Sequence, residues 1–435
     1  AGVRPHKNSI NNYCYPENPE AGIDLFLEKL VQETEKEHED ILEQADETDA
    51  MFGELYSWYL RNPEYRSRVQ KLVQSAFAGK PEDIISQSVA KALYGEVSPY
   101  SATRLERFAA CAFAHFLQYG MKLTERVEYE FKPMDMGNVM HEALESFAEE
   151  VRKRGMKWTE LTEQERNEIA DRCLDNIVAD YGNTVLKSSA RNEYMIERTR
   201  RLLRRTVWAL QKQLEQGEFQ PEGFEVTFGG GRIDRVDIME DQNKVYVKVI
   251  DYKTGNTSFD LVYLYHGLQL QLMIYLDGAL RVEQKKYPDK EIIPAGVFYY
   301  NIKDPMIQEK IDADVEAVSA GLMKELKMNG LVQADPELVY RMDSSLGSIP
   351  VAFNKDGSFR KNSSVADRTQ FAVLGRYVRT KIEKIRSSIL EGDAEVSPYE
   401  LGKKNACTYC PYMTVCGFDR RLSGYESVSY THLTL

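Results

Sequence analysis

The sequence lacks several features that would assign a protein to a broad class at once. It has no run of about 18 apolar residues and no apolar segment near its start, so we expect neither a membrane span nor a secretory signal and place the protein in the cytoplasm. No G-x-x-x-x-G-K-[ST] segment occurs, which excludes ATP binding by a P-loop. Six cysteines in 435 residues are too few for a disulfide framework, and a C-x-x-C pair among them suggests metal ligation.

Positive charge is also in short supply. Lysine and arginine number 56 against 68 acidic residues, and the formal net charge of -12 excludes a surface that is basic everywhere. Any nucleic-acid site must therefore be local. Arg198, Arg201 and Arg205 recur at helical steps and form one candidate basic face. Two interpretations stay open for this face, which are contact with a DNA backbone and pairing with nearby acids.

The order of periodic segments predicts an α/β protein, and 43% hydrophobic residues are enough for a sizeable core. The expected helices cover 22–45, 50–61, 64–78, 101–119, 137–151, 160–216, 264–282, 306–345 and 365–391. The expected strands lie within 224–254 and at 294–302. We divide the chain into a helical region at 1–97, a main domain at 98–425 and a tail at 426–435. Because the first residue is not methionine and the tail resembles nothing before it, we expect an excised piece with a non-native end.

Two short acidic segments, G-R-I-D-R-V-D (231–237) and V-I-D-Y-K-T-G (249–255), are the strongest chemical signal. A hairpin that turns at 241–244 places Asp234 opposite Asp251, with Lys253 on the same face. Opposed side chains have Cβ atoms roughly 4.5–5.5 Å apart, so two carboxylates there could share one divalent cation. Hard oxygen ligands suit Mg²⁺. The alternative is an exposed hairpin with an ordinary Asp–Lys pair. Asp237 has the opposite parity and is expected on the other face.

Three further residues could support such a site. His141 lies at the edge of the apolar stripe of the 137–151 helix and could be a third ligand, which would also admit Mn²⁺. Gln271 and Tyr275 lie one turn apart on a largely apolar helix, where they could hold a water molecule or a phosphate. The alternative for each of the three is an ordinary structural role in the core.

Four cysteines have the spacing of a second metal centre. Cys407, Cys410 and Cys416 lie in C-T-Y-C-P-Y-M-T-V-C, and the distant Cys111 would complete four ligands. Spacing alone leaves tetrahedral Zn²⁺ and an iron–sulfur cluster equally open.

From 98 to 418 the chain resembles the nuclease domain of the AddB family, a subunit of bacterial AddAB helicase–nucleases. That domain lies in the RecB-like branch of the PD-(D/E)XK superfamily. Beyond the two acidic segments and the cysteines, the resemblance rests on S-P-Y-S-A-T-R-L-E-R-F-A-A-C (98–111), G-N-V-M-H (137–141) and Q-L-M-I-Y (271–275). Ala112 departs from the family, which often has proline after the first cysteine; this puts only the local backbone geometry in doubt.

The resemblance implies a PD-(D/E)XK core, which is a mixed central sheet flanked by helices, with extra helices and a preceding helical region at 1–97 from an inactive helicase-like part. It implies His141, Asp234 and Asp251 as metal ligands, Lys253 as the catalytic lysine, and Gln271 and Tyr275 as site residues. It also implies that the four cysteines hold a [4Fe–4S] cluster.

The expected activity is that of a Mg²⁺-dependent DNA exonuclease. The resemblance further implies that it cuts one strand during double-strand-break processing, beside an AddA-type partner that hydrolyses ATP. Two alternatives are a DNA-binding scaffold with a degenerate nuclease site and a CRISPR-adaptation-type nuclease. The intact D…D-x-K set argues against the scaffold, and the region at 1–95 has no place in the usually shorter CRISPR-adaptation chains.

Overall fold

The computed structural model describes residues 23, 26, 27, 47–76, 84–95, 101–124, 133–180, 189–229, 231–307, 314–420 and 427–429. It divides into two compact units, each built from separate stretches of chain. The smaller unit takes Ala1–Leu93, Cys111–Met121 and Ile389–Thr431, and the larger takes Tyr94–Ala110, Lys122–Ser388 and His432–Leu435. No helix among the described residues is long and apolar enough to cross a membrane. The boundary expected at 97/98 and nearly all of the tail at 426–435 lie outside the described residues.

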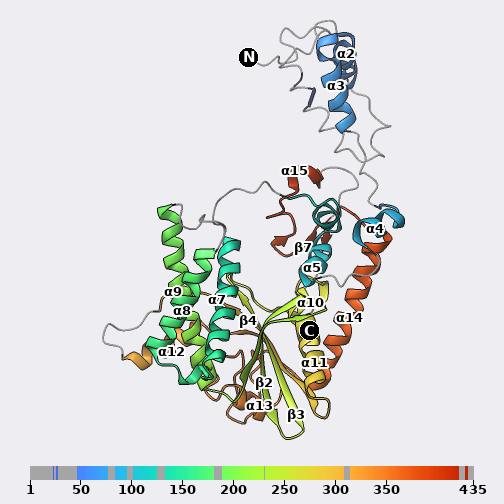
Figure 1. Ribbon diagram of the computed structural model, residues 1–435. Helices are drawn as coiled ribbons and strands as arrows, with labels where there is room; N and C mark the ends of the chain where they lie inside the picture. The colour runs from blue at the N-terminus through green and yellow to red at the C-terminus, as the bar shows by residue number, and fades with distance from the viewer. Residues whose placement is uncertain are drawn as a thin grey trace. The chain divides into compact units, whose positions relative to one another are not determined.

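A six-stranded mixed sheet forms the centre of the larger unit (Figure 1). Its strands are β1 (Gln220–Phe228), β2 (Gly231–Asp241), β3 (Lys244–Lys253), β4 (Glu291–Asn301), β5 (Asn329–Gln333) and β6 (Val365–Ala366), in that order across the sheet. The β1–β2, β2–β3 and β4–β5 pairs are antiparallel, whereas β3–β4 and β5–β6 are parallel. This arrangement confirms the expected α/β fold with a mixed central sheet flanked by helices.

Helices cover both faces of this sheet, which explains why β2 and β3 are buried along almost their whole length (Figure 1). The helices of the larger unit are α5 (Ala102–Ala110), α7 (Pro133–Lys153), η4 (Trp158–Glu160), α8 (Glu163–Asp180), α9 (Ala190–Glu215), α10 (Leu261–His266), α11 (Gln271–Lys286), α12 (Val315–Glu325), α13 (Pro336–Met342) and most of α14 (Arg368–Glu391). Met140, Phe147 and Leu203 of α7 and α9 share one core with Ile250 and Phe298 of the sheet.

The structure corrects the helix expected at 264–282. Gly267 adopts φ 83, and its N–H closes the last turn of α10 on the carbonyls of Leu264 and Tyr263, so the chain turns before α11 begins at Gln271. A left-handed residue at this position is the usual end of a helix. The helix expected at 101–119 is likewise interrupted, because Cys111 is extended (φ -170) between α5 and the short α6 (Ala112–His115) and π-helix η3 (Phe116–Gly120).

The mainly helical stretch expected at 306–345 also contains strand β5. Gly330 of β5 crosses so close to β4 that a Cβ there would lie 1.9 Å from the carbonyl oxygen of Val297. The strand therefore depends on a glycine for its close backbone approach, and a five-residue strand interrupted by glycine gives little periodic signal.

The smaller unit contains a second aromatic-rich core and the cysteine region. In α2 (Glu47–Arg61) and α3 (Pro63–Ala76), Leu55, Tyr59 and Val69 pack with Ile23 and Phe26. Its remaining elements are most of α4 (Gln87–Tyr94), α6, η3, β7 (Tyr399–Leu401), β8 (Lys404–Asn405), α15 (Met413–Cys416) and β9 (Val428–Ser429). The helix expected at 22–45 lies almost wholly outside the described residues.

Candidate metal centre and active site

The site lies where β2 and β3 separate. Their pairing runs from Asp241↔Lys244 to Arg235↔Ile250, which confirms the register expected from the hairpin, although the turn is only Gln242-Asn243. Beyond Arg235, β2 continues along β1 to Gly231, while β3 continues along β4 to Lys253. We call these diverging ends, 231–234 of β2 and 251–253 of β3, the fork. Side chains at a fork are not confined by a neighbouring strand on one side, so they can approach a shared ligand.

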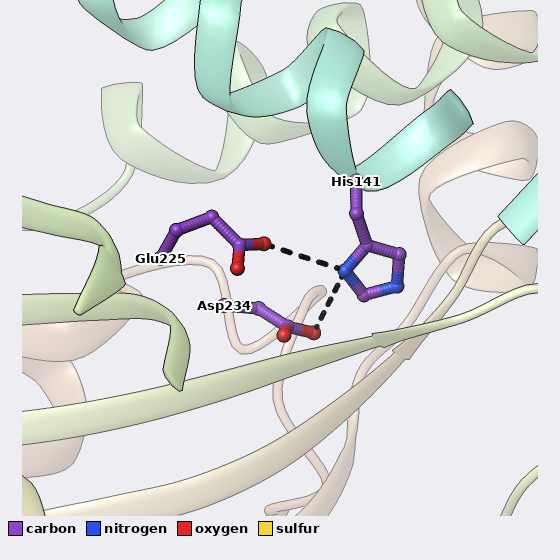
Figure 2. Close-up of side chains that lie close together, drawn as sticks. All are labelled: His141, Glu225 and Asp234. Carbon is purple, nitrogen blue, oxygen red and sulfur yellow. Dashed lines mark ion pairs between the residues drawn. The ribbon is translucent and has the colours of Figure 1, made fainter. Parts of the chain in front are cut away.

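Three potential metal ligands meet at the fork (Figure 2). Asp234 Oδ2 lies 3.4 Å from His141 Nδ1, and Glu225 Oε1 lies 3.6 Å from the same nitrogen. One ligand atom from each residue falls within 4.8 Å of the other two. The three side chains come from α7, β1 and β2, so the fold brings together residues up to 93 positions apart along the chain. The buried Asp234 also accepts a hydrogen bond from Tyr252 N at 2.7 Å.

Negative charge from two carboxylates surrounds the imidazole of this group. Burial disfavours the protonated form of His141, but hydrogen bonding and negative charge from Asp234 and Glu225 outweigh it and raise the pKa of the imidazole to about 10. The exposed Arg232 adds a positive charge, with its Nε 2.5 Å from Glu225 Oε2. In the absence of a metal ion, the carboxylates are therefore compensated by a protonated histidine and an arginine.

Asp251 lies deeper, with 1% of its surface exposed. Burial and then the negative charge of Asp234 raise the pKa of its carboxyl, and Lys253 opposes the shift. Lys253 Nζ lies 2.5 Å from Asp251 Oδ2, but no donor among the described residues meets that oxygen with hydrogen-bond geometry. Asp251 stands outside the compact 4.8 Å group and forms its ion pair with the lysine.

Helix α11 holds the lysine from the adjoining face. Lys253 Nζ donates to Gln271 Oε1 at 2.8 Å, and Gln271 Nε2 donates to the Tyr275 hydroxyl at 2.9 Å. Burial raises the pKa of Tyr275 well above its ordinary value, so the phenol stays neutral. The Gln271 and Tyr275 side chains suggested by the sequence thus meet Lys253 in a continuous hydrogen-bonded row.

Asp237 lies apart from this site, as its parity predicted. It is fully buried, 2.6 Å from Arg235 Nε and 2.9 Å from Lys248 Nζ. Burial opposes its ionised form, but these two cations lower the pKa of the carboxyl. Its charge is therefore compensated within the core, which leaves Asp234 as the ligand candidate of this strand.

Two acidic residues near the site carried no functional prediction from the sequence. Glu225 lies between Phe224 and Val226, which pair with Arg235 and Ile233, so it stands beside Asp234. The pairing arithmetic used for β2 and β3 would have found it if applied to the preceding hairpin. Glu106 of α5 accepts N–H groups from Leu270 at 2.7 Å and Gln271 at 2.9 Å. No local pattern connects residues 164 positions apart.

The basic face of α9 is largely paired with acids. Arg201 and Arg205 both contact Asp304, at 2.8 and 3.4 Å. Arg200 and Arg204 on the same helix both pair with Asp171. Of the two interpretations, these contacts favour acid pairing for Arg201 and Arg205.

The four cysteines predicted to share a centre gather in the smaller unit. Cys111, Cys407, Cys410 and Cys416 line one small cavity, whose wall includes Phe113 and Tyr412. Burial and then the neighbouring thiols raise the pKa of Cys407 to about 11, and burial also raises the pKa of Cys111. Cys173 is a buried free thiol of the larger unit, away from this group.

Comparison with known proteins identifies a family and several relatives of this chain. Residues 99–417 match the PD-(D/E)XK nuclease superfamily. The chain is 41% identical over 404 residues to an ATP-dependent helicase/deoxyribonuclease subunit of Lachnoclostridium phytofermentans, an alignment that covers 87% of this chain and 35% of the relative. A protein with the same description from Alkaliphilus metalliredigens is 35% identical, in an alignment that covers 85% of this chain and 34% of the relative. Another from a Thermoanaerobacter species is 34% identical, and that alignment covers 87% of this chain and 35% of the relative. The chain thus spans about a third of the length of the curated relatives it matches.

Proposed function

The chain belongs to the PD-(D/E)XK nuclease superfamily, and we propose that its larger unit hydrolyses phosphodiester bonds of DNA with a divalent metal ion. The observation that carries this proposal is the meeting of Asp234, Glu225 and His141 at the fork, with Asp251 and Lys253 beside them. A set of three carboxylates, an imidazole and a lysine has the chemistry of metal-assisted phosphoryl hydrolysis.

The residues present fit a divalent cation. Two carboxylates converge on one histidine, and the buried Asp251 carboxylate lies nearby, with Lys253 Nζ 2.5 Å from its Oδ2 atom. A cation would add positive charge beside the Asp251 carboxylate, whose pKa is raised by burial and then by the negative charge of Asp234. Oxygen ligands suit Mg²⁺, and the imidazole also admits Mn²⁺. We therefore assign His141, Asp234 and Asp251 as ligands and add Glu225.

When bound, the cation would polarise a phosphoryl oxygen and lower the pKa of a water molecule. Lys253 supplies a positive charge at the same place, where it stabilises the negative charge that develops on the phosphate. Gln271 fixes the lysine amine through its amide oxygen. Tyr275 accepts from Gln271 and keeps its own hydroxyl proton, which it can donate toward a phosphate or a water molecule.

We assign the four cysteines to a [4Fe–4S] cluster. Four thiols around one small cavity are a complete donor set for such a cluster, and Phe113 and Tyr412 form part of the cavity wall. The cluster would link the short α6 region to the cysteine trio at the other end of the sequence. Its role here is structural, since the residues of the fork belong to the other unit.

The similar proteins are described as subunits of an ATP-dependent helicase/deoxyribonuclease. We propose that this chain is the nuclease module of such a subunit. It would act as an exonuclease on one DNA strand at double-strand ends. An AddA-type partner would supply ATP hydrolysis and cut the other strand.

Cleavage of linear duplex DNA by the purified chain tests the activity. With Mg²⁺ or Mn²⁺ we expect degradation that EDTA abolishes, and Asp251→Asn should lower the rate at least about 100-fold. Asp175→Asn, which changes an exposed acid on α8 with 61% of its side chain accessible, is the matched control and should retain the rate. Metal-independent DNA binding without cleavage would instead favour the scaffold alternative.

A further inference from the structure

Helix α11 begins without a cap of its own. Its N-cap residue, Leu270, has no side chain that can accept the free N–H groups of the first turn. Glu106 supplies that acceptor from α5, because its Oε1 atom accepts both Leu270 N at 2.7 Å and Gln271 N at 2.9 Å. A carboxylate at this end also meets the positive end of the helix dipole.

Gln271, one of the two residues whose N–H groups Glu106 accepts, also holds Lys253. Gln271 is the first residue of α11, and its side-chain oxygen accepts from Lys253 Nζ at 2.8 Å. Lys253 Nζ in turn lies 2.5 Å from Asp251 Oδ2. Two hydrogen bonds to the backbone at Leu270 and Gln271 therefore determine where the Gln271 amide oxygen stands and, through it, where the lysine charge lies.

Glu106 lies largely removed from water, although a carboxylate is usually more stable when it is hydrated. Burial raises the pKa of Glu106 to about 7, although the two backbone hydrogen bonds and the charge of Lys253 lower it. Among the described residues, Tyr275 of α11 and Tyr299 of β4 also interact electrostatically with Glu106, and burial raises their pKa values so that both stay neutral. Glu106 thus lies inside the electrostatic environment of the site.

We propose that Glu106 is a positioning residue of the nuclease site, which fixes the first turn of α11 so that Gln271 holds Lys253 beside Asp251. This inference rests on the proposed function. Glu106 acts through Gln271 and Lys253, and it accepts its two hydrogen bonds from backbone groups of α11. Its effect is therefore expected on the chemical step and not on DNA affinity.

Three substitutions in the full 435-residue chain separate positioning from charge. Glu106→Ala removes both hydrogen bonds, and we expect kcat to fall about 100-fold with KM within about twofold, since a displacement of about 1 Å is enough for such a loss. Glu106→Gln keeps an oxygen at the same reach and should recover kcat to within about threefold of wild type, because the same two N–H groups can still be accepted. Glu106→Asp keeps the charge but shortens the reach, so its kcat should stay below that of the glutamine variant.

The matched control is the N-cap of another helix in the same unit. Asp335 caps α13 by accepting Glu337 N at 3.0 Å and Leu338 N at 3.3 Å. Asp335→Ala should destabilise the fold in a similar way while kcat stays unchanged. The proposal is overturned if Asp335→Ala lowers kcat as much as Glu106→Ala does, or if Glu106→Ala leaves kcat unchanged.

It is equally overturned if Glu106→Asp is more active than Glu106→Gln, because charge and not reach would then matter. The Asp and Gln variants decide the question even if the alanine variant does not fold. A wild-type chain that cleaves no DNA would refute the proposed function itself, whereas an active wild type with normal Glu106 variants would refute only the positioning role.

Discussion

The Asp234 carboxylate accepts a hydrogen bond from the backbone N–H of Tyr252 at 2.7 Å, although their two strands no longer pair at this level. The side chain thus replaces the carbonyl that a paired strand would offer to a buried N–H group. At the same time Asp234 faces His141 and Glu225. One residue therefore keeps the fork compatible with a folded sheet and contributes to the proposed metal site.

Substitutions of Asp234 should separate these two roles. Asp234→Asn keeps an oxygen for Tyr252 N but loses the charge, so we expect near-normal stability and a rate of DNA cleavage at least about 100-fold lower. Asp234→Ala leaves the Tyr252 N–H without its acceptor and should cost a further 1–3 kcal/mol or so, roughly the penalty for an unsatisfied buried donor. Urea unfolding followed by tryptophan fluorescence checks the second effect, since Trp158 and Trp208 both lie in the larger unit. Equal stability of the two variants would argue against the structural role.

Glu225 is expected to contribute directly to metal affinity. Its carboxylate is nearly buried, at 7% side-chain exposure, and lies 3.6 Å from His141 Nδ1. Glu225→Gln removes one negative charge from the ligand group, so we expect the Mn²⁺ concentration at half-maximal cleavage to rise about tenfold or more. Glu222→Gln is the control, because Glu222 lies on the same strand but pairs with Lys286. A normal metal requirement in Glu225→Gln would exclude Glu225 from the ligand set.

The cysteine assignment predicts a coloured protein. Anaerobically purified chain should contain iron and show a broad absorption band near 400 nm, roughly where thiolate-to-iron charge transfer is expected. Cys410→Ser should lose both, whereas Cys173→Ser, which changes a buried thiol of the other unit, should retain them. Stoichiometric zinc without iron would favour the tetrahedral alternative that the spacing leaves open.

Predictions from the sequence were most accurate for structural features that local geometry determines. The register of β2 and β3 follows from a period of two and a tight turn, and Asp237 lies on the other face from Asp234 for the same reason. The N-cap of α5 is equally local, because Ser101 Oγ accepts a hydrogen bond from Arg104 N at 3.3 Å. These features need only residues that are near one another along the chain or joined by one hairpin.

Other features, some of them dependent on distant contacts and some on unusual backbone conformations, were missed or wrong. The break at Gly267 is hidden within an apolar run, although its left-handed conformation ends α10. Strand β5 depends on the close approach of Gly330 to Val297 of β4. Glu225 adopts φ 49, a conformation that glutamate rarely takes and that no residue pattern predicts. The link from Glu106 to α11 joins helices far apart in sequence.

The raised pKa of Glu106 also predicts how stability depends on pH. Its folded value is about 7 against an ordinary 4.5, so between these pH values the folded chain binds more protons than the unfolded chain. The contribution of this group to stability is therefore complete below pH 4.5 and is lost as the pH rises toward 7. The total corresponds to roughly 3 kcal/mol.

The glutamine side chain of Glu106→Gln cannot ionise, so this variant should not lose stability at this position as the pH rises. Relative to wild type, the glutamine variant should gain most of those roughly 3 kcal/mol between about pH 5 and pH 8, measured by urea unfolding at each pH. Asp335→Asn, at the cap of α13, should show no such gain over the same range. A stability difference between Glu106→Gln and wild type that does not change with pH would mean that Glu106 titrates at its ordinary value. The two backbone hydrogen bonds and Lys253 would then balance the effect of burial, and the carboxylate would be charged throughout the working range of the site.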